Sequence, residues 1–150
     1  MEWFNIFGFL FVVIMMIPNI VYAIKKPEGF ENKYKNKFVL FLEKVGRIGC
    51  FIFMFINLPG TYLGFWSLPC MFFYIILESI LLLGYIIIFI VCFNKNTLFR
   101  AIALSVIPSV MFLLGGILYA SALLTIFSVI FAPCHILISV KNTLATTFRS

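Results

Sequence analysis

The stretch PCMFFYIILESILLLGYIIIFIVCF, residues 69–93, contains 25 residues and only one charged side chain, that of Glu78. A helix of that length extends about 37 Å, whereas the hydrocarbon core of a bilayer is about 30 Å thick. The polar sequence NKNT, residues 94–97, follows at once and would turn the chain in the headgroup region. The stretch therefore predicts a helix that crosses a membrane.

Apolar runs of similar length lie on both sides of this stretch. The 150-residue chain is 64% hydrophobic and only 11% charged, whereas soluble domains are about half apolar and about a quarter charged. We predict an all-α integral membrane protein, a bundle of five transmembrane helices within one domain, residues 1–150. The first span is expected to be retained and not removed as a signal peptide, since no basic residue precedes it. The predicted spans cover residues 3–24, 42–65 and 69–93, with two more in 98–140 that turn near Gly115, Gly116 and Ser121.

The basic residues give these spans a direction. All eleven Lys and Arg side chains lie in three segments: seven between the first and second apolar stretches, with Lys44 and Arg47 at the inner end of the second span, two between the third and fourth, and two after the fifth. Basic residues collect in the cytoplasmic loops of membrane proteins, so we expect the N-terminus outside and the C-terminus in the cytoplasm. The formal net charge of +6 is then a topology signal, and no nucleic-acid partner is predicted.

An amphipathic segment, residues 30–45, follows the first predicted span. Pro27 and Gly29 break the preceding helix, and a stripe of aromatic and aliphatic side chains then begins at Phe30 and ends at Val45. The opposite face carries lysines. A helix with one aromatic and one basic face lies on a membrane surface, so the lipid bilayer, and anionic lipids in particular, are its predicted partners. A solvated anchoring helix is the alternative.

The second predicted span, residues 42–65, contains a break. The apolar run that starts at Ile48 meets the sequence NLPGT, residues 57–61, after too few residues to cross a bilayer. We therefore predict a kinked helix with Asn57, Pro59, Gly60 and Thr61 at the kink. The alternative is a helix that begins earlier, with Glu43, Lys44 and Arg47 at the inner interface. A broken helix in a bilayer leaves backbone carbonyl groups that must be buried in protein or face a wet cavity.

Glu78 is the first candidate site residue. It is the only acidic residue well inside a predicted span, and ionisable groups within a membrane are candidates for function. It lies about 14 Å below the outer end of its span, a depth close to that of Asn57 and Thr61. We expect the three side chains to form one polar ligand-binding pocket that opens to the outside. The alternative is a neutral Glu78 that only hydrogen-bonds the carbonyl groups of the kink.

Asn19 and His135 are further candidate ligand-binding residues. Each lies in the inner part of a predicted span and shortly after a proline, Pro18 or Pro133. A histidine at such a place can respond to protons. The structural alternative for both residues is a hydrogen bond to backbone that the proline has freed, or to a neighbouring helix.

No catalytic, metal-binding or cofactor motif is visible in the sequence. The chain has no Asp, a single His, and four Cys without a C-x-x-C pair. Magnesium-dependent lipid diphosphate chemistry, multi-histidine haem or iron sites and thiol redox chemistry are therefore not predicted. We assign no catalytic residue, metal or cofactor, and we do not predict enzymatic activity.

The stretch PNIVYAIKKPEGFENKYKNKFVLFLEKVGRIGCFIFMFINLPG, residues 18–60, resembles a family of short multi-span membrane proteins of Gram-positive bacteria. The resemblance implies a place in a bacterial cytoplasmic membrane. It brings with it no activity and no site residues.

Two functional hypotheses follow from these patterns. In the first, the bundle binds or transports a small molecule or ion that enters from outside toward Glu78 and the kinked second helix. In the second, the chain is an accessory, immunity or regulatory membrane subunit without pocket chemistry, which its small size and the segment 30–45 favour. A homo-oligomer or a membrane-protein partner is compatible with either hypothesis.

Overall fold

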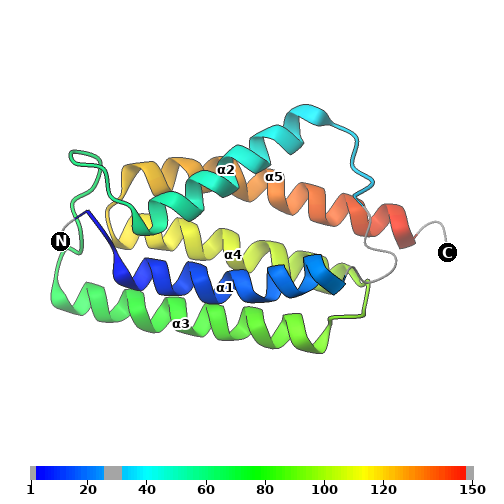
Figure 1. Ribbon diagram of the computed structural model, residues 1–150, viewed down its shortest axis with the longest axis horizontal. Helices are drawn as coiled ribbons and strands as arrows, with labels where there is room; N and C mark the ends of the chain where they lie inside the picture. The colour runs from blue at the N-terminus through cyan, green and yellow to red at the C-terminus, as the bar shows by residue number, and fades with distance from the viewer. Residues whose placement is uncertain (1–2, 26–31, 148–150) are drawn as a thin grey trace.

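The computed structural model describes residues 3–25 and 32–147 and shows five helices (Figure 1). They are α1 (Ile6–Lys25), α2 (Lys37–Phe55), α3 (Leu68–Val91), α4 (Leu98–Leu118) and α5 (Ala122–Thr147). Within the described residues, β structure is limited to two isolated bridges, Phe4 with Ile56 and Tyr62 with Ser121. The predicted all-α architecture is confirmed.

The five helices form a closed ring. Around it the neighbours are α1, α2, α5, α4 and α3, and α3 packs against α1 to complete the circuit, while α2 also touches α4 across the interior. Successive helices run in opposite directions (Figure 1). We name the two ends of the bundle by what lies there. The loop end holds residues 56–67 and the turn between α4 and α5, and the basic end holds Lys25, Lys95 and the N-terminus of α4.

Four of the helices, α1, α3, α4 and α5, are long and apolar enough to cross a membrane. Their outward faces are apolar. On α3, for example, Ile76, Ile80, Leu83, Ile87 and Ile90 are each more than half exposed, at the three- and four-residue spacing of one helix face. The helix α2 is not among the four because its first half carries Lys37, Glu43, Lys44 and Arg47.

The start of α2 corrects one prediction. The helix begins at Lys37, where the side chain of Asn36 caps it by accepting hydrogen bonds from the backbone N–H groups of Phe38 and Val39. Residues 32–36 are not helical, so the amphipathic helix predicted from Phe30 is wrong over that stretch, and Phe30 itself lies outside the described residues. Capping explains the later start, since an asparagine side chain competes for backbone donors before the helix begins.

The end of α2 corrects another prediction. The helix ends at Phe55, and residues 56–67 form a loop, so the kinked span over residues 42–65 is wrong. Pro59 cannot donate a helical hydrogen bond, and Gly60 adopts a positive φ of 83°. The loop finds backbone partners elsewhere: Asn57 N–H donates to Trp3 C=O (2.8 Å), and Ala122 N–H donates to Thr61 C=O (2.9 Å).

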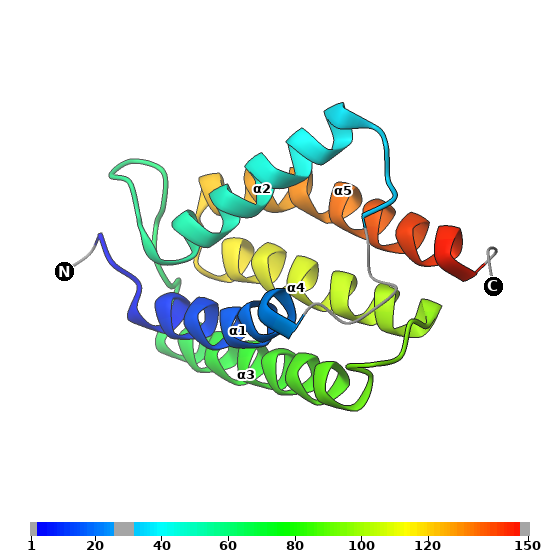
Figure 2. The same ribbon diagram turned by 45° about the vertical axis from the view of Figure 1, so that its right-hand side comes forward.

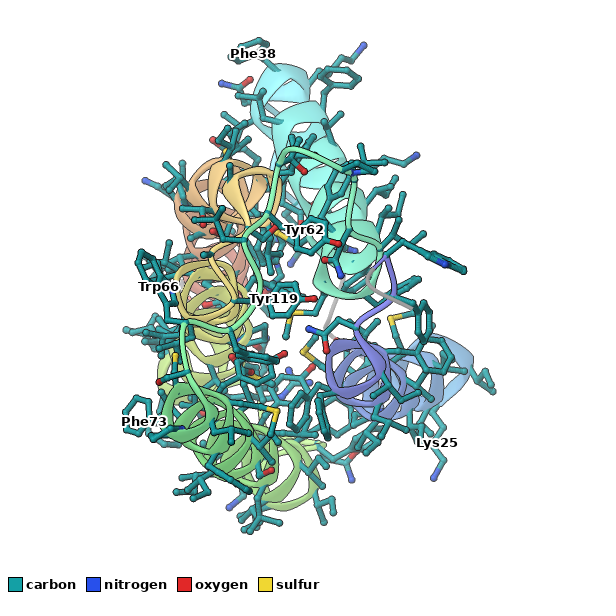
Figure 3. The ribbon with its side chains drawn as sticks, turned by 90° about the vertical axis from the view of Figure 1, so that its left-hand side faces the viewer. Lys25, Phe38, Tyr62, Trp66, Phe73 and Tyr119 are labelled. Carbon is teal, nitrogen blue, oxygen red and sulfur yellow. The ribbon has the colours of Figure 1, made fainter. Side chains whose placement is uncertain are left out.

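Aromatic rings close the loop end. The Tyr62 ring stacks on the Tyr119 ring with centroids 5.9 Å apart and planes within 2°. The Phe65 ring packs against the Tyr119 ring in a T-shaped contact, with centroids 4.8 Å apart. In an end-on view, Tyr119 points into the ring of helices, whereas Trp66 and Phe73 point outwards (Figure 3). Trp66 is 73% exposed, as expected for a side chain at a membrane interface.

Small residues set the distance between α5 and its two neighbours. A Cβ added at Gly46 would lie 2.9 Å from backbone atoms of Phe131, and one at Gly49 would lie 2.2 Å from the Phe127 ring. A Cβ at Gly116 of α4 would lie 2.6 Å from Thr125 Oγ1, so α4 and α5 also approach closely. Helices packed this closely bring short polar side chains into direct contact.

Candidate functional site

A cavity of about 450 Å³ lies within the bundle and extends to its basic end. Each of the five helices contributes at least one polar side chain to its wall, among them Asn19 from α1, Arg47 from α2, Tyr85 from α3, Arg100 from α4 and His135 from α5. Two of these residues, Asn19 and His135, are candidates that the sequence predicted. Figures 1 and 2 show α2 inclined to the other helices, so that its Lys37 end stands away from α1.

The wall changes character along the cavity. Toward the middle of the bundle it is apolar, and toward the basic end it is polar. The apolar part is formed by Met15, Met16, Phe51, Leu104, Phe112 and Phe131, and the polar part includes Asn32, Asn96, Asn142, Thr143 and Thr146. The rings of Phe51 and Phe112 meet at 5.6 Å, and Phe131 meets Phe112 at 5.7 Å. These aromatic contacts form the closed end of the cavity.

Asn19 holds α1 to α3 at the cavity wall. Its Nδ2 donates to the carbonyl of Met15 (2.9 Å), and its Oδ1 accepts from the hydroxyl of Tyr85 (3.1 Å). Pro18 lies beside it in α1 and removes one helical N–H. Both structural alternatives predicted for Asn19, a bond to backbone and a bond to a neighbouring helix, are therefore observed, and a ligand role stays a prediction.

His135 belongs to a three-residue cluster between α2 and α5. Oε1 of Glu43 accepts from Nε and Nη2 of Arg47 and lies 2.9 Å from Nδ1 of His135. Glu43 is 5% exposed, and it pairs with Arg47 one helical turn later in α2. The His135 ring also stacks on Phe131 at 4.6 Å. Arg47 and His135 line the cavity and Glu43 does not. The Glu43 carboxylate therefore holds two cavity-lining side chains in position from outside the cavity.

Arg100 enters the cavity wall from the first turn of α4. Thr97 caps this helix by accepting from the N–H of Arg100, and the guanidinium of Arg100 lies 5.2 Å from the centre of the Tyr22 ring. Cations over aromatic faces are favoured when they are removed from water, and Arg100 is only 8% exposed. The sequence pattern indicates Arg100 only as a topology signal. Its place three residues after a helix-capping threonine could have shown that it lies inside a helix.

Glu78 lies elsewhere. It is completely buried, and within the described residues neither of its carboxyl oxygens has a hydrogen-bond partner. A Cβ added at Gly115 would be 3.5 Å from Glu78 Oε1, so the carboxyl group faces α4. It does not line the cavity. It lies almost two helical turns from Tyr85 along α3. It is therefore on the loop-end side of the rings of Phe51, Phe112 and Phe131, which form the closed end of the cavity.

Asn57 and Thr61 belong to the loop end. Asn57 is 3% exposed and donates through Nδ2 to the hydroxyl of Tyr119 at 2.9 Å. The hydroxyl of Thr61 donates to the carbonyl of Leu58 at 2.8 Å, within a turn. Neither residue lines the cavity. The structure thus does not bring Asn57, Thr61 and Glu78 together in this cavity, and their role as ligands stays a prediction.

Comparison of the chain with protein families, with curated proteins and with solved structures finds no significant match. Among the described residues, no three His, Cys, Asp or Glu side chains gather closely enough to hold a metal ion. The site must therefore be judged on its own geometry.

Proposed function

We propose that this chain is an integral protein of a bacterial cytoplasmic membrane that binds a small molecule in the cavity at its basic end. Its N-terminus lies outside and its C-terminus lies in the cytoplasm, so the polar part of the cavity faces the cytoplasm. Four helices are long and apolar enough to cross. In this proposal α2 is the fifth crossing, and its charges Glu43 and Arg47 are tolerated because they pair with each other.

The cavity is the observation that carries this proposal. Small-molecule sites in proteins have volumes of about 300–1,000 Å³, a mainly apolar lining and a few convergent polar groups, and they occur between the helices of bundles. The cavity of about 450 Å³ meets each of these conditions, with polar side chains from all five helices above an aromatic closed end. The cavity extends to the basic end and not to the loop end, so the proposed entry lies opposite to the one expected from the sequence.

Filling the cavity tests the proposal. Ala101 lines the cavity and is 8% exposed, so Ala101→Phe should occupy the space without changing the surface. Gly84→Phe is a matched control, because a Cβ at Gly84 meets no other atom within 4 Å. Native mass spectrometry of protein purified in mild detergent should show a bound non-protein mass on the wild type and on Gly84→Phe, and not on Ala101→Phe. The same bound masses on all three proteins would contradict the proposal.

Cysteine labelling in intact cells tests the orientation. Leu63 is 82% exposed in the loop, and Lys35 is exposed before α2. With the native cysteines removed, a membrane-impermeant reagent should label Leu63→Cys and should leave Lys35→Cys unlabelled until the cells are permeabilised. Labelling of Lys35→Cys in intact cells would reverse the orientation.

If the protein also transports the bound molecule, Glu78 would lie on the path of that molecule through the bundle. A molecule that passed from the cavity toward the outside would first cross the closure at Phe51 and Phe112, and the next buried polar side chain on α3 is Glu78. Asn57 and Thr61 lie beyond it. In that case Glu78→Gln should reduce flux across vesicles while leaving binding in the cavity unchanged. Unchanged flux would remove Glu78 from the path.

A second candidate function is that of an accessory or regulatory subunit. It is favoured by the exposed aromatic rings of Phe38 and Phe41, which are 68% and 63% exposed beside Lys37 and Lys44. Such a face can bind a partner helix, a second copy of the chain or anionic lipid. A photo-crosslinking amino acid at Phe41 should capture a protein if this function is correct. Crosslinks to lipid alone would reject it and leave the surface-anchoring role.

A further inference from the structure

We infer that the cavity takes an amphiphile with a phosphate head and an apolar chain, with its head at the basic end. This inference rests on the proposed function, because it names the class of molecule that the cavity would bind. It is carried by the charges on the wall, by the position of the hydrogen-bond donors and by the apolar closed end.

The charged side chains on the cavity wall are of one sign. Arg47 and Arg100 line it, and none of the described residues that line it is acidic. Glu43 accepts from Arg47 Nε and Nη2 with one oxygen, but a guanidinium has five N–H donors, so donors remain for a second acceptor. Arginine is the side chain whose forked geometry fits phosphate oxygens, as it fits carboxylates. The wall thus presents cationic donors to an anion.

The two arginines act on one region of the cavity although they come from different helices. Both line the cavity together with Tyr85, whose hydroxyl donates to Asn19. The N-terminus of α4 lies beside them, because Asn96 and Arg100 on either side of it both line the cavity. A helix N-terminus adds a partial positive charge and favours anions. A phosphate placed near Tyr85 would therefore meet donors from α2 and α4.

The apolar part of the cavity would not stabilise a small inorganic anion. Met15, Phe51, Leu104, Phe112 and Phe131 form its wall. A free phosphate would leave this apolar space filled by water, whereas an acyl chain would bury apolar surface there at about 25 cal/mol per Å². The combination of a cationic and an apolar part thus favours an amphiphile over a soluble phosphate.

Binding of three probes to the full-length chain in neutral detergent tests this inference. The probes are myristoyl lysophosphatidate, monomyristoylglycerol, which lacks the phosphate, and inorganic phosphate, which lacks the chain. Native mass spectrometry titrations should show that lysophosphatidate binds at least about tenfold more tightly than either of the others, since a hydrogen bond to a charged group changes affinity by about that factor. Arg47→Gln and Arg100→Gln should each weaken lysophosphatidate binding about tenfold and leave monomyristoylglycerol unaffected.

Lys44→Gln is the matched control. It removes one positive charge from α2, but Lys44 is exposed and does not line the cavity, so its affinity for lysophosphatidate should equal that of the wild type. If Arg100→Gln does not fold, Arg47→Gln and the charge-conserving Arg47→Lys remain. Arg47→Lys should bind lysophosphatidate less tightly than wild type because a lysine cannot form the fork.

The possible results separate the two proposals. If lysophosphatidate and monomyristoylglycerol bind equally and Ala101→Phe abolishes both, the cavity binds ligands but the inferred head group is wrong. If inorganic phosphate binds as tightly as lysophosphatidate, the amphiphile is wrong. If no probe binds, or Lys44→Gln weakens binding as much as Arg47→Gln, the inference falls. If in addition wild type carries no mass that Ala101→Phe lacks, the proposed function falls with it.

Discussion

Glu43 and Glu78 are both buried carboxyl groups, with residue exposures of 5% and 0%, but their surroundings differ completely. Glu43 bonds Arg47 and His135 and orders the wall of a cavity. Glu78 has no hydrogen-bond partner among the described residues and faces packed helices. If the proposed function is correct, isolation in an apolar sequence is a weaker guide to a binding site than convergence of polar groups from several helices. A carboxyl group that stands alone in a bilayer stays neutral unless a cation accompanies it.

The largest expected effect comes from separating the helices that carry the Glu43 cluster. Gly46→Leu places a side chain against the backbone of Phe131, where even a Cβ would lie at 2.9 Å. We expect a loss of about 3 kcal/mol in the free energy of unfolding, because backbone atoms cannot yield to the new side chain. Denaturant titration in mixed micelles measures it. Gly84→Leu, which meets no neighbour, should change stability by less than about 0.5 kcal/mol, and equal losses for both variants would refute the packing account.

A smaller loss is expected from removing the paired carboxyl group. Glu43→Leu leaves Arg47 and His135 beside an apolar side chain, and an unsatisfied polar group costs about 1–3 kcal/mol. We expect a loss in the lower half of this range, because the side chain of Arg47 is 47% exposed and water can accept hydrogen bonds from some of its N–H groups. The same unfolding titration is the measurement. A Glu43→Leu protein as stable as the wild type would show that the cluster does not hold α2 to α5.

The smallest effect is expected at the unpaired carboxyl group. Glu78→Leu replaces a side chain without hydrogen-bond partners by an apolar one of similar volume, which is often neutral or stabilising. We expect the free energy of unfolding to stay within about 1 kcal/mol of wild type or to rise. A loss larger than that for Glu43→Leu would reverse the comparison, since it would mean that Glu78 makes a stabilising interaction, with water or an ion, that Leu cannot replace.

Much of the fold was predictable because it depends on local patterns. The span predicted at residues 69–93 is α3, Leu68–Val91, and the turn predicted near Gly115, Gly116 and Ser121 lies between α4 and α5. The end of α2 was not predictable in this way. The break at Pro59 is visible in the sequence, but the loop is stable because it bonds the α4–α5 turn and the N-terminal segment, and those partners are far away along the chain.

The site was predicted only in part, for a similar reason. Asn19 and His135 stood out because a polar residue near a proline in a span is unusual. Arg47, Tyr85 and Arg100 did not stand out, because the side of each helix that faces the interior depends on which helices are neighbours. The depth of Glu78 could be counted along α3, but its distance from the cavity depends on the aromatic closure at Phe51 and Phe112.

The affinity of myristoyl lysophosphatidate for Arg100→Gln and Glu78→Gln, measured side by side against wild type, tests the central claim most directly. Both variants replace an ionisable side chain by glutamine in the interior of the bundle, and only Arg100 lines the cavity. We predict that Arg100→Gln weakens binding about tenfold and that Glu78→Gln leaves it unchanged. Loss of binding in Glu78→Gln with wild-type binding in Arg100→Gln would contradict the account and place the site at Glu78.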